Sequence, residues 1–293
     1  MVSVQGRVSE ERFLGHVWKL QEWIFKYTLR INRQRDSRHM DGDGRKKTTR
    51  TGGIHYRHEL KFLCTQLQME LLEDQLGCLM EKDRHVGASG FYTVRSLYFD
   101  DYGNGAMKQK EDGLDERRKY RVRSYLRGGD EAFHLEIKHR AGDRIWKESC
   151  LLTREEVSLV LNGVFLEYGK NGTGSPVQES VRNRFETARE TLLLKPAVIV
   201  EYDRVPYVYP EGNVRITLDR NICGSSETHK FMEKELTAVP VLERGRHLLE
   251  VKYDEYLPDV LRMALQVVSL DRVSFSKYYL CRMAGEPLKM LVE

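Results

Sequence analysis

Charged side chains at every second position are the feature of this sequence most able to do chemistry. They alternate with apolar residues in segments such as RRKYRVRSYL and HLEIKHR. An extended strand points successive side chains to opposite faces, so each such segment has one charged and one apolar face. The residues on the charged faces are Arg57, Glu59, Lys61, Arg117, Lys119, Arg121, Arg123, Glu136, Lys138, Arg215, Asp219, Glu250 and Lys252.

This mixture of charges predicts a particular kind of ligand. Guanidinium groups bind phosphate oxygens in pairs and ammonium groups act as point charges, so a row of both suits a chain of phosphoryl groups. Enclosed cations are costly unless carboxylates, water or a bound polyanion neutralise them. Glu59, Glu136 and Glu250 could in turn hold Mg²⁺ or Mn²⁺, which bridge carboxylate and phosphate oxygens. We therefore expect a site for a triphosphate or polyphosphate with a divalent metal.

The elements that must position these side chains are strands joined by short turns. Period-two patterning predicts eight strands, at 55–62, 94–100, 117–126, 132–140, 144–151, 197–208, 213–219 and 247–253. Helical periodicity predicts helices at 64–81, 153–163, 180–194 and 257–268. For any one strand, an ordinary sheet whose polar face meets water explains the pattern equally well. Taken together, the strands predict an α+β fold, a closed eight-stranded antiparallel β-barrel with helices outside and charges inside.

The remaining segments indicate the organisation of the chain. Residues 9–31 have the pattern of an amphipathic helix, which packs on the barrel, mediates self-association or lies on a membrane surface. Residues 32–53 have the composition of a linker, so we expect residues 1–53 to precede a domain at 54–293. Near the end, SFSKYYL offers Ser274, Ser276 and Lys277 either as a phosphate clamp or as a surface turn.

Composition limits the class of protein. The 48 Lys and Arg against 44 Asp and Glu leave a net charge of only +4, so the position of charges matters more than their sum. The five cysteines include no CxxC pair, which favours a reducing cytoplasm. No apolar run reaches the ~18 residues of a membrane helix. A soluble cytoplasmic protein is the expectation.

Several of these segments, in this order, resemble the triphosphate tunnel metalloenzymes of the CYTH-like superfamily. The similarity is greatest to the VTC-type polyphosphate polymerase domain and extends over about residues 54–283. The matching segments are RHELKF, SLYFDD, RRKYRVRSY, HLEIKHR, VEYDRVPYV, VRITLD, LLEVKY and SFSKYYL.

The resemblance implies a fold and an activity. The fold is an eight-stranded antiparallel tunnel, and the activity is transfer of the γ-phosphoryl group of ATP onto a growing polyphosphate chain with a divalent metal, often Mn²⁺. By resemblance, Lys61, Arg121, Arg123, Lys138 and Arg215 bind the reacting phosphates, Glu250 binds the metal, and Ser276 and Lys277 form a far clamp. We assign further substrate contacts to Arg57, Lys119, Lys147, Arg204 and Lys252, and further metal contacts to Glu59 and Glu136.

One departure from the family pattern bears on the reaction. Hydrolytic tunnel enzymes begin with Glu-x-Glu-x-Lys, whereas this chain has Arg57 at the first position, followed by Glu59 and Lys61. The substitution disfavours two-metal hydrolysis. Hydrolysis of triphosphates and a non-catalytic polyphosphate-binding module stay as alternatives. Nucleic acid is not expected as a ligand, because a tunnel admits one flexible chain and no groove-reading motif is present.

Overall fold

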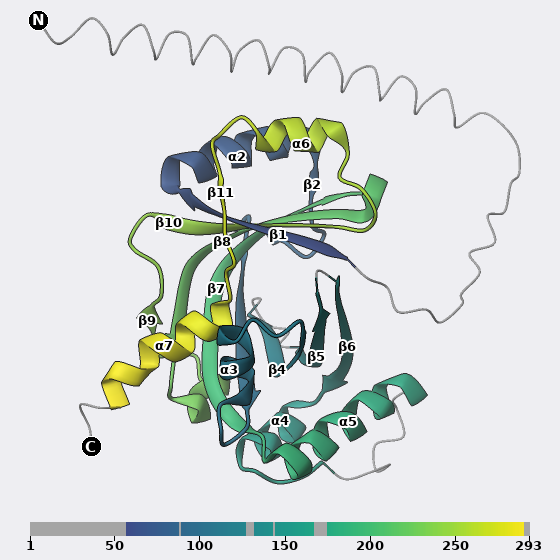
Figure 1. Ribbon diagram of the computed structural model, residues 1–293, viewed down its shortest axis with the longest axis vertical. Coiled ribbons are helices and arrows are strands. Elements are labelled where there is room, and N and C mark those ends of the chain that lie inside the picture. The colour runs from purple at the N-terminus through teal and green to yellow at the C-terminus, as the bar shows by residue number, and fades with distance from the viewer. Residues whose placement is uncertain (1–56, 88, 127–131, 143, 167–174, 290–293) are drawn as a thin grey trace, which may run out of the picture.

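One antiparallel sheet with helices on its outside accounts for most of the described chain (Figure 1). The computed structural model describes residues 57–87, 89–126, 132–142, 144–166 and 175–289. The helix expected at 9–31 and the linker at 32–53 lie outside these residues. The strands are β1 (His58–Thr65), β2 (Glu81–Lys82), β3 (Tyr92–Asp100), β4 (Glu116–Leu126), β5 (Phe133–Ala141), β6 (Arg144–Leu152), β7 (Lys195–Tyr209), β8 (Val214–Ser225), β9 (Val239–Pro240), β10 (Arg246–Tyr253) and β11 (Asp271–Arg272).

The eight strands expected from the sequence are confirmed as β1, β3, β4, β5, β6, β7, β8 and β10. Period-two patterning found them because each has an apolar outer face. The three further strands among the described residues, β2, β9 and β11, have two residues each and therefore show no periodicity. The described strands are ordered β11-β1-β10-β8-β7-β3-β4-β5-β6, with β2 paired to β7 and β9 to β8.

The expected closure into an eight-stranded barrel is wrong. Within the described residues the sheet has eleven strands and stays open between β1 and β6, which share a single bridge at Arg57 and Ile145. The reason lies on the outer edge of β1, where Phe62 and Leu63 pair with β11. Because β11 occupies that edge, β6 can reach only the first residues of the β1 segment.

Six α-helices are described, and four of them cover the outer faces of the sheet. They are α2 (Gln66–Leu79), α3 (Gly105–Glu111), α4 (Arg154–Leu161), α5 (Pro176–Leu192), α6 (Asp259–Leu265) and α7 (Lys277–Lys289). Figure 1 shows α2 and α6 together over the half of the sheet that contains β1, β10 and β8, and α4 and α5 at the opposite end. The capping boxes of Thr65 and Thr153 fix where α2 and α4 begin.

Three buried apolar clusters hold these layers together. Met69 and Leu72 of α2 pack with Leu261 of α6 against the outer face of β8 and β10. Phe185 of α5 lies fully buried with its ring edge-on to Phe99 at 5.1 Å, within the cluster beneath β4 and β5. The apolar faces are thus turned outward, toward the helices, which leaves the charged faces for the interior.

Two helices were not expected from the sequence. Helix α7 packs closely on β8, where a side chain on Gly224 would meet Cys281 at 2.6 Å. Its sequence contains Gly285 and Pro287, which are both poor helix formers, so the sequence pattern did not indicate a helix in this segment. Helix α3 is short, and its start is held by Asp100 and Asp101, whose carboxylates accept hydrogen bonds from backbone N–H groups of the first turn.

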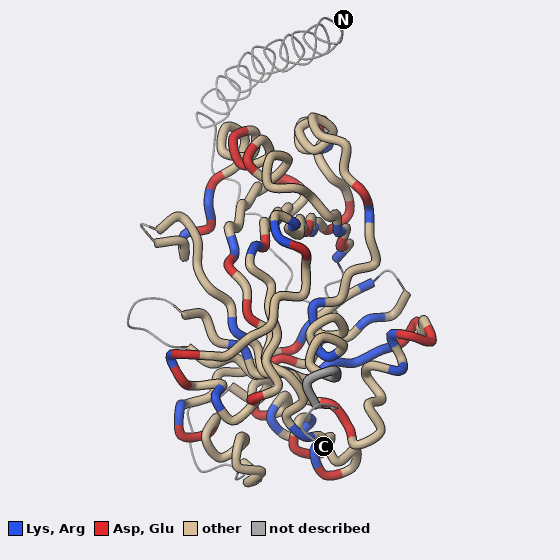
Figure 2. Tube along the Cα trace, turned by 90° about the vertical axis from the view of Figure 1, so that its left-hand side faces the viewer, with Lys and Arg blue, Asp and Glu red and all other residues tan. Residues whose placement is uncertain are grey.

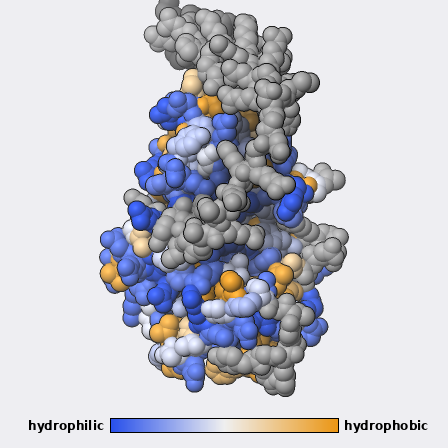
Figure 3. Space-filling view, turned by 90° about the vertical axis from the view of Figure 1, so that its right-hand side faces the viewer, coloured by the Kyte–Doolittle hydropathy of each residue, from blue (hydrophilic) through white to orange (hydrophobic). Residues whose placement is uncertain are grey.

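The described residues present a mixed surface on the side that Figure 3 shows. The face seen in Figure 3 is mostly hydrophilic, with hydrophobic residues in small separate areas. Figure 2 shows Lys and Arg interspersed with Asp and Glu along the described part of the chain rather than gathered in one block. None of the helices in the described part of the chain is long and apolar enough to cross a membrane.

The packing of α5 under the sheet leads to a stability prediction. Phe185→Ala should lower the free energy of unfolding by about 3–5 kcal/mol, because it leaves a cavity beneath Phe99. Leu192→Ala, on the same helix but 47% exposed, should change it by less than about 1 kcal/mol. Urea unfolding followed by circular dichroism measures both. Equal losses in the two variants would contradict the assigned core.

Candidate functional site

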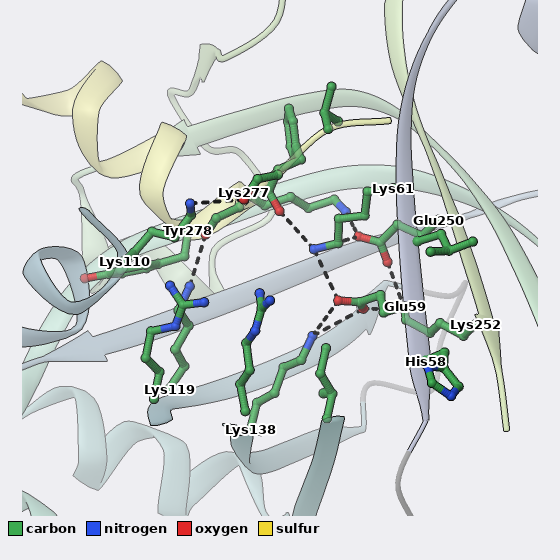
Figure 4. Close-up of a pocket in the computed structure, with 18 of the residues that line it drawn as sticks. His58, Glu59, Lys61, Lys110, Lys119, Lys138, Glu250, Lys252, Lys277 and Tyr278 are labelled. Carbon is green, nitrogen blue, oxygen red and sulfur yellow. Dashed lines mark hydrogen bonds and ion pairs between the residues drawn. The ribbon is translucent and has the colours of Figure 1, made fainter. Parts of the chain in front are cut away.

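A polar cavity of about 600 Å³ lies between the inner faces of the two halves of the sheet. Its walls come from β1, β4, β5, β7 and β10, and from the segment that leads into α7 (Figure 4). Most residues that the sequence singled out line it, namely Glu59, Lys61, Lys119, Arg121, Arg123, Lys138, Arg204, Glu250, Lys252, Ser276 and Lys277. The period-two argument therefore identified the inner face correctly.

Four predicted residues are not part of this lining. Arg57 pairs with Asp254 at 3.1 Å, beside the bridge between β1 and β6. Arg215 pairs with Asp83 at 2.8 Å and donates to the Tyr92 hydroxyl at 3.1 Å. Glu136 lies buried behind the arginines, and half-exposed Lys147 contacts it from β6.

Two carboxylates and four lysines form a continuous network of ion pairs in the cavity. Glu59 contacts Lys61 at 3.3 Å, Lys138 at 3.3 Å and Lys252 at 3.4 Å. Glu250 contacts Lys277 at 2.7 Å and Lys252 at 2.8 Å, with Lys61 at 3.9 Å. The backbone places them, because Glu59 faces Lys252 and Lys61 faces Glu250 across the β1–β10 ladder.

These contacts set the protonation state of both carboxyl groups. Burial alone would raise the pKa of Glu59, but Lys138, Lys61 and Lys252 outweigh it and hold the pKa well below its usual range. The pKa of Glu250 is held low in the same way, since Lys252 and Lys277 outweigh the effect of burial. Both groups are therefore carboxylates at neutral pH.

A third acidic residue, Asp219, organises the wall formed by β7 and β8. Arg204 faces it across the ladder and donates two hydrogen bonds of 2.7 Å to its two oxygens. Lys277 reaches the same carboxylate at 2.7 Å. The sequence placed Asp219 on the charged face of its strand. Its pairing with Arg204 and Lys277, which only the structure shows, indicates that it positions these two cations.

Beneath the cavity, Glu136 fixes the orientation of two arginines. It accepts a hydrogen bond of 2.6 Å from Arg121, and Arg123 lies 3.9 Å away. Arg121 also donates to the Tyr98 hydroxyl at 2.7 Å, and Arg123 to the Tyr202 hydroxyl at 3.3 Å. The sequence analysis missed these tyrosines, because an inward tyrosine is indistinguishable from an apolar strand residue by type.

Two lysines on neighbouring strands are electrostatically unusual. Burial lowers the pKa of Lys138 to about 8, against the opposing attraction of Glu59. Burial also lowers the pKa of Lys119 well below its usual value, and Lys61 and Lys138 lower it further. Lys119 donates to the Ser276 hydroxyl at 3.0 Å. An anion in the cavity would favour the protonated form of both lysines.

Of the three glutamates predicted to bind a metal, Glu59 and Glu250 are the pair that could hold a divalent cation together. Glu59 and Glu250 are ionised neighbours that share Lys61 and Lys252 as partners, and carboxylate oxygens are the donors that Mg²⁺ and Mn²⁺ prefer. Within the described residues no three His, Cys, Asp or Glu side chains form a complete ligand set. Such an ion would take its other ligands from water and phosphate, as Mg²⁺ commonly does.

Comparison with known proteins gives a family model and several similar folds. The model described as the VTC domain matches residues 56–284. A Bacillus halodurans structure, provisionally named an adenylate cyclase, has 16% identity and a TM-score of 0.47, covering 76% of this chain and 95% of that one. A Pyrococcus horikoshii protein has 13% identity and a TM-score of 0.43, covering 78% and 99%. The Mimivirus capping enzyme triphosphatase has 12% identity and a TM-score of 0.33, covering 74% and 92%. No curated protein matched the sequence.

The buried carboxylates predict how stability depends on pH. Burial would raise the pKa of Glu136, but Arg121, Arg123 and Lys147 hold it well below its usual range. A depressed folded-state pKa contributes stability above the unfolded value of about 4.3, and that stability is lost as pH falls through the folded value. Glu136→Gln should therefore lower the free energy of unfolding by about 3–5 kcal/mol at pH 7, and the deficit should shrink on acidification below about pH 4.3.

Guanidinium chloride unfolding between neutral and acid pH measures this deficit. Glu190→Gln, which removes an exposed carboxylate on α5, is the control and should follow the wild type closely. A deficit for Glu136→Gln that stays constant with pH would show that the lost ionic partner is not the cause.

Proposed function

Because this protein belongs to the VTC domain family, we propose that it transfers the γ-phosphoryl group of ATP onto a polyphosphate chain inside the cavity. The observation that carries the proposal is the convergence of inward lysines and arginines on one enclosed space beside a pair of ionised glutamates. Phosphoryl transfer needs little covalent chemistry from the protein and depends on positioning and on neutralisation of charge. An enclosed set of fixed cations supplies both.

In the proposed reaction, a terminal phosphate oxygen of the chain attacks the γ-phosphorus of ATP while the bond to the β-phosphate oxygen breaks and ADP leaves. Lys61, Arg121, Arg123 and Lys138 would neutralise the charge on the transferring group. Asp219 keeps Arg204 and Lys277 in place, so these two cations need no reorganisation when substrate enters. No covalent intermediate on the protein is required.

Glu59 and Glu250 would hold Mn²⁺ or Mg²⁺, which supplies charge neutralisation and orientation of phosphate oxygens when bound. Glu136 has a different role in this proposal, because its oxygens face Arg121 and Lys147 rather than the cavity. Arg57 and Lys147 stay predicted substrate contacts, and Arg215 stays a predicted contact of the reacting phosphates. Each has its own acidic partner outside the lining. We place the reaction in the cytoplasm, where the free cysteines of the described chain would stay reduced.

Incubation with ATP and Mn²⁺ tests the proposed activity. We expect long-chain polyphosphate on a gel together with release of ADP. Lys138→Ala should reduce the rate by about 10²–10³-fold, the usual effect of losing one preorganised group that stabilises transition-state charge. Lys108→Ala, on the exposed side of α3, serves as the control.

The alternatives give different products in the same assay. Release of ADP with orthophosphate and no polymer would overturn polymerisation in favour of a triphosphatase. Binding of polyphosphate without any release of ADP would indicate a non-catalytic binding module.

The depressed pKa of Lys138 predicts a proton linkage. Its pKa of about 8 in the free protein should rise when tripolyphosphate binds, because the anion favours the charged form. Binding at pH 8 should therefore take up protons, and Lys138→Met should take up fewer. Calorimetry in buffers of different ionisation enthalpy measures the uptake. A binding enthalpy that is the same in every buffer would contradict this assignment.

A further inference from the structure

The first turn of α7 is held by a contact that lies outside the cavity. Tyr278 directly follows Lys277 on this helix, and its hydroxyl donates a hydrogen bond to the carboxylate of Asp100, the last residue of β3. Both Tyr278 and Asp100 are only 2% exposed. Asp100 itself lies outside the described lining of the cavity. The contact therefore joins a helix that reaches the cavity to a residue that a ligand there would not touch.

The carboxylate of Asp100 is fixed in its orientation. Its Oδ1 accepts hydrogen bonds of 2.9 Å from the backbone N–H groups of Asp101 and Ala106, at the start of α3. Its Oδ2 accepts from the Tyr278 hydroxyl. Each oxygen of this buried carboxylate thus has a donor, as buried polar groups generally require. Asp100 connects the end of β3, the start of α3 and the first turn of α7.

A second tyrosine on α7 makes the same kind of bond at the surface. The Tyr279 hydroxyl donates to Glu111 of α3 at 3.1 Å, and this bond is exposed. Water can replace an exposed hydrogen bond, whereas a buried acceptor that loses its donor stays unpaired. The two neighbouring tyrosines therefore make matched contacts, and we expect the buried contact of Tyr278 to hold the helix more firmly.

The residue that this contact positions is Lys277. It is the first residue of α7, and its ammonium group contacts Asp219 and Glu250 at 2.7 Å each. Figure 4 shows Lys277 extending toward Glu250, with Tyr278 on the opposite side of the cavity. Lys277 and Tyr278 share a rigid peptide plane, so a displacement of Tyr278 would also move the backbone of Lys277.

An anion that enters the cavity would compete for the ammonium group of Lys277. The group has three N–H donors, and carboxylates already take up two contacts with it, so phosphate oxygens would share or displace these contacts. The bond between Tyr278 and Asp100 is removed from this competition, because both groups are buried away from the ligand. The next turn of α7 is held separately, where Cys281 packs against Gly224.

We propose that Asp100 is a positioning residue, which acts through the Tyr278 hydroxyl to hold Lys277 at the cavity wall while an anionic ligand exchanges with its carboxylate partners. Neither Asp100 nor the Tyr278 hydroxyl contacts the ligand. The identification of the ligand as a phosphate chain rests on the proposed function, whereas the anchoring of α7 is a property of the free protein.

Hydrogen exchange tests the anchor without any ligand. Tyr278→Phe removes the hydroxyl but keeps the ring, which packs on Tyr98 with the ring centroids 5.2 Å apart. The backbone amides of residues 278–281 should exchange about tenfold faster in this variant, because the first turn of α7 opens more readily. Tyr279→Phe is the matched control and should exchange as the wild type does. Unchanged exchange in Tyr278→Phe would overturn the anchor, whatever the ligand.

Binding of tripolyphosphate without ATP or metal separates positioning from a merely structural role. Tyr278→Phe should weaken binding by about fivefold, and Tyr279→Phe by less than about twofold. Lys277→Met removes the positioned cation and should weaken binding by about tenfold. Once Lys277 is replaced, adding Tyr278→Phe should weaken binding by less than about twofold, although it should still lower the melting temperature.

Asp100 is tested by a second cycle of variants. Asp100→Asn keeps an oxygen for the N–H groups of Asp101 and Ala106 but removes the anionic acceptor of the Tyr278 hydroxyl. It should weaken tripolyphosphate binding about as much as Tyr278→Phe does. The double variant should bind within about twofold of either single variant, because the two changes remove the same bond. Additive losses would contradict the action of Asp100 through Tyr278.

The remaining outcomes separate this inference from the proposed function. Equal weakening by Tyr278→Phe with and without Lys277, or faster exchange with unchanged binding, would overturn the positioning role alone. A wild type that binds tripolyphosphate and shows the expected losses, but makes no polymer from ATP, would overturn the proposed function alone. A wild type that does not bind tripolyphosphate would overturn both.

Discussion

Burying lysine and arginine side chains costs free energy unless opposite charges accompany them, and this balance underlies the whole interior of the fold. Glu59, Glu136, Asp219 and Glu250 each contact two or more inward cations. Among the described residues, Lys138 has no other carboxylate partner than Glu59, and Arg121 none other than Glu136, so loss of either glutamate would leave a buried cation uncompensated. The same contacts hold the cations at defined positions before any ligand arrives, so the stability of the interior and the preorganisation of the site depend on the same side chains.

The outer helices make such an interior possible. Because α2 and α6 cover one half of the sheet and α4 and α5 the other, the apolar face of every long strand has a packing partner outside. The core therefore lies around the charged space rather than at its centre. Helix α7 links the two regions, since Tyr278 and Cys281 pack among apolar residues while Lys277 reaches Asp219 and Glu250.

Sequence periodicity predicted the long strands and most of the cavity lining, because a two-residue period decides which face a side chain occupies. It could not decide how far along the strand the cavity extends. Arg215 and Lys147 lie on the predicted charged face of their strands but outside the cavity lining, where Asp83 and Glu136 pair with them. Lys110 of α3 also lines the cavity, and the sequence analysis missed it because it comes from a short helix whose docking depends on tertiary contacts.

The error about closure has a similar origin. Pairing between β1 and β11 joins segments that are over 200 residues apart, and β11 contributes only Asp271 and Arg272. Two residues carry no periodic signal, so the sequence could not show that the edge of β1 is occupied. Counting strands predicts that a sheet is large enough to close, but closure also needs two free edges.

The open edge between β1 and β6, which we call the seam, also determines how easily the cavity can widen. Along the long ladders, moving two strands apart would break a row of backbone hydrogen bonds, whereas at the seam the described residues share one bridge at Arg57 and Ile145. The salt bridge between Arg57 and Asp254 ties the end of β1 to the segment after β10, not to β6. The cavity can therefore widen on this side at a lower cost than along the long ladders.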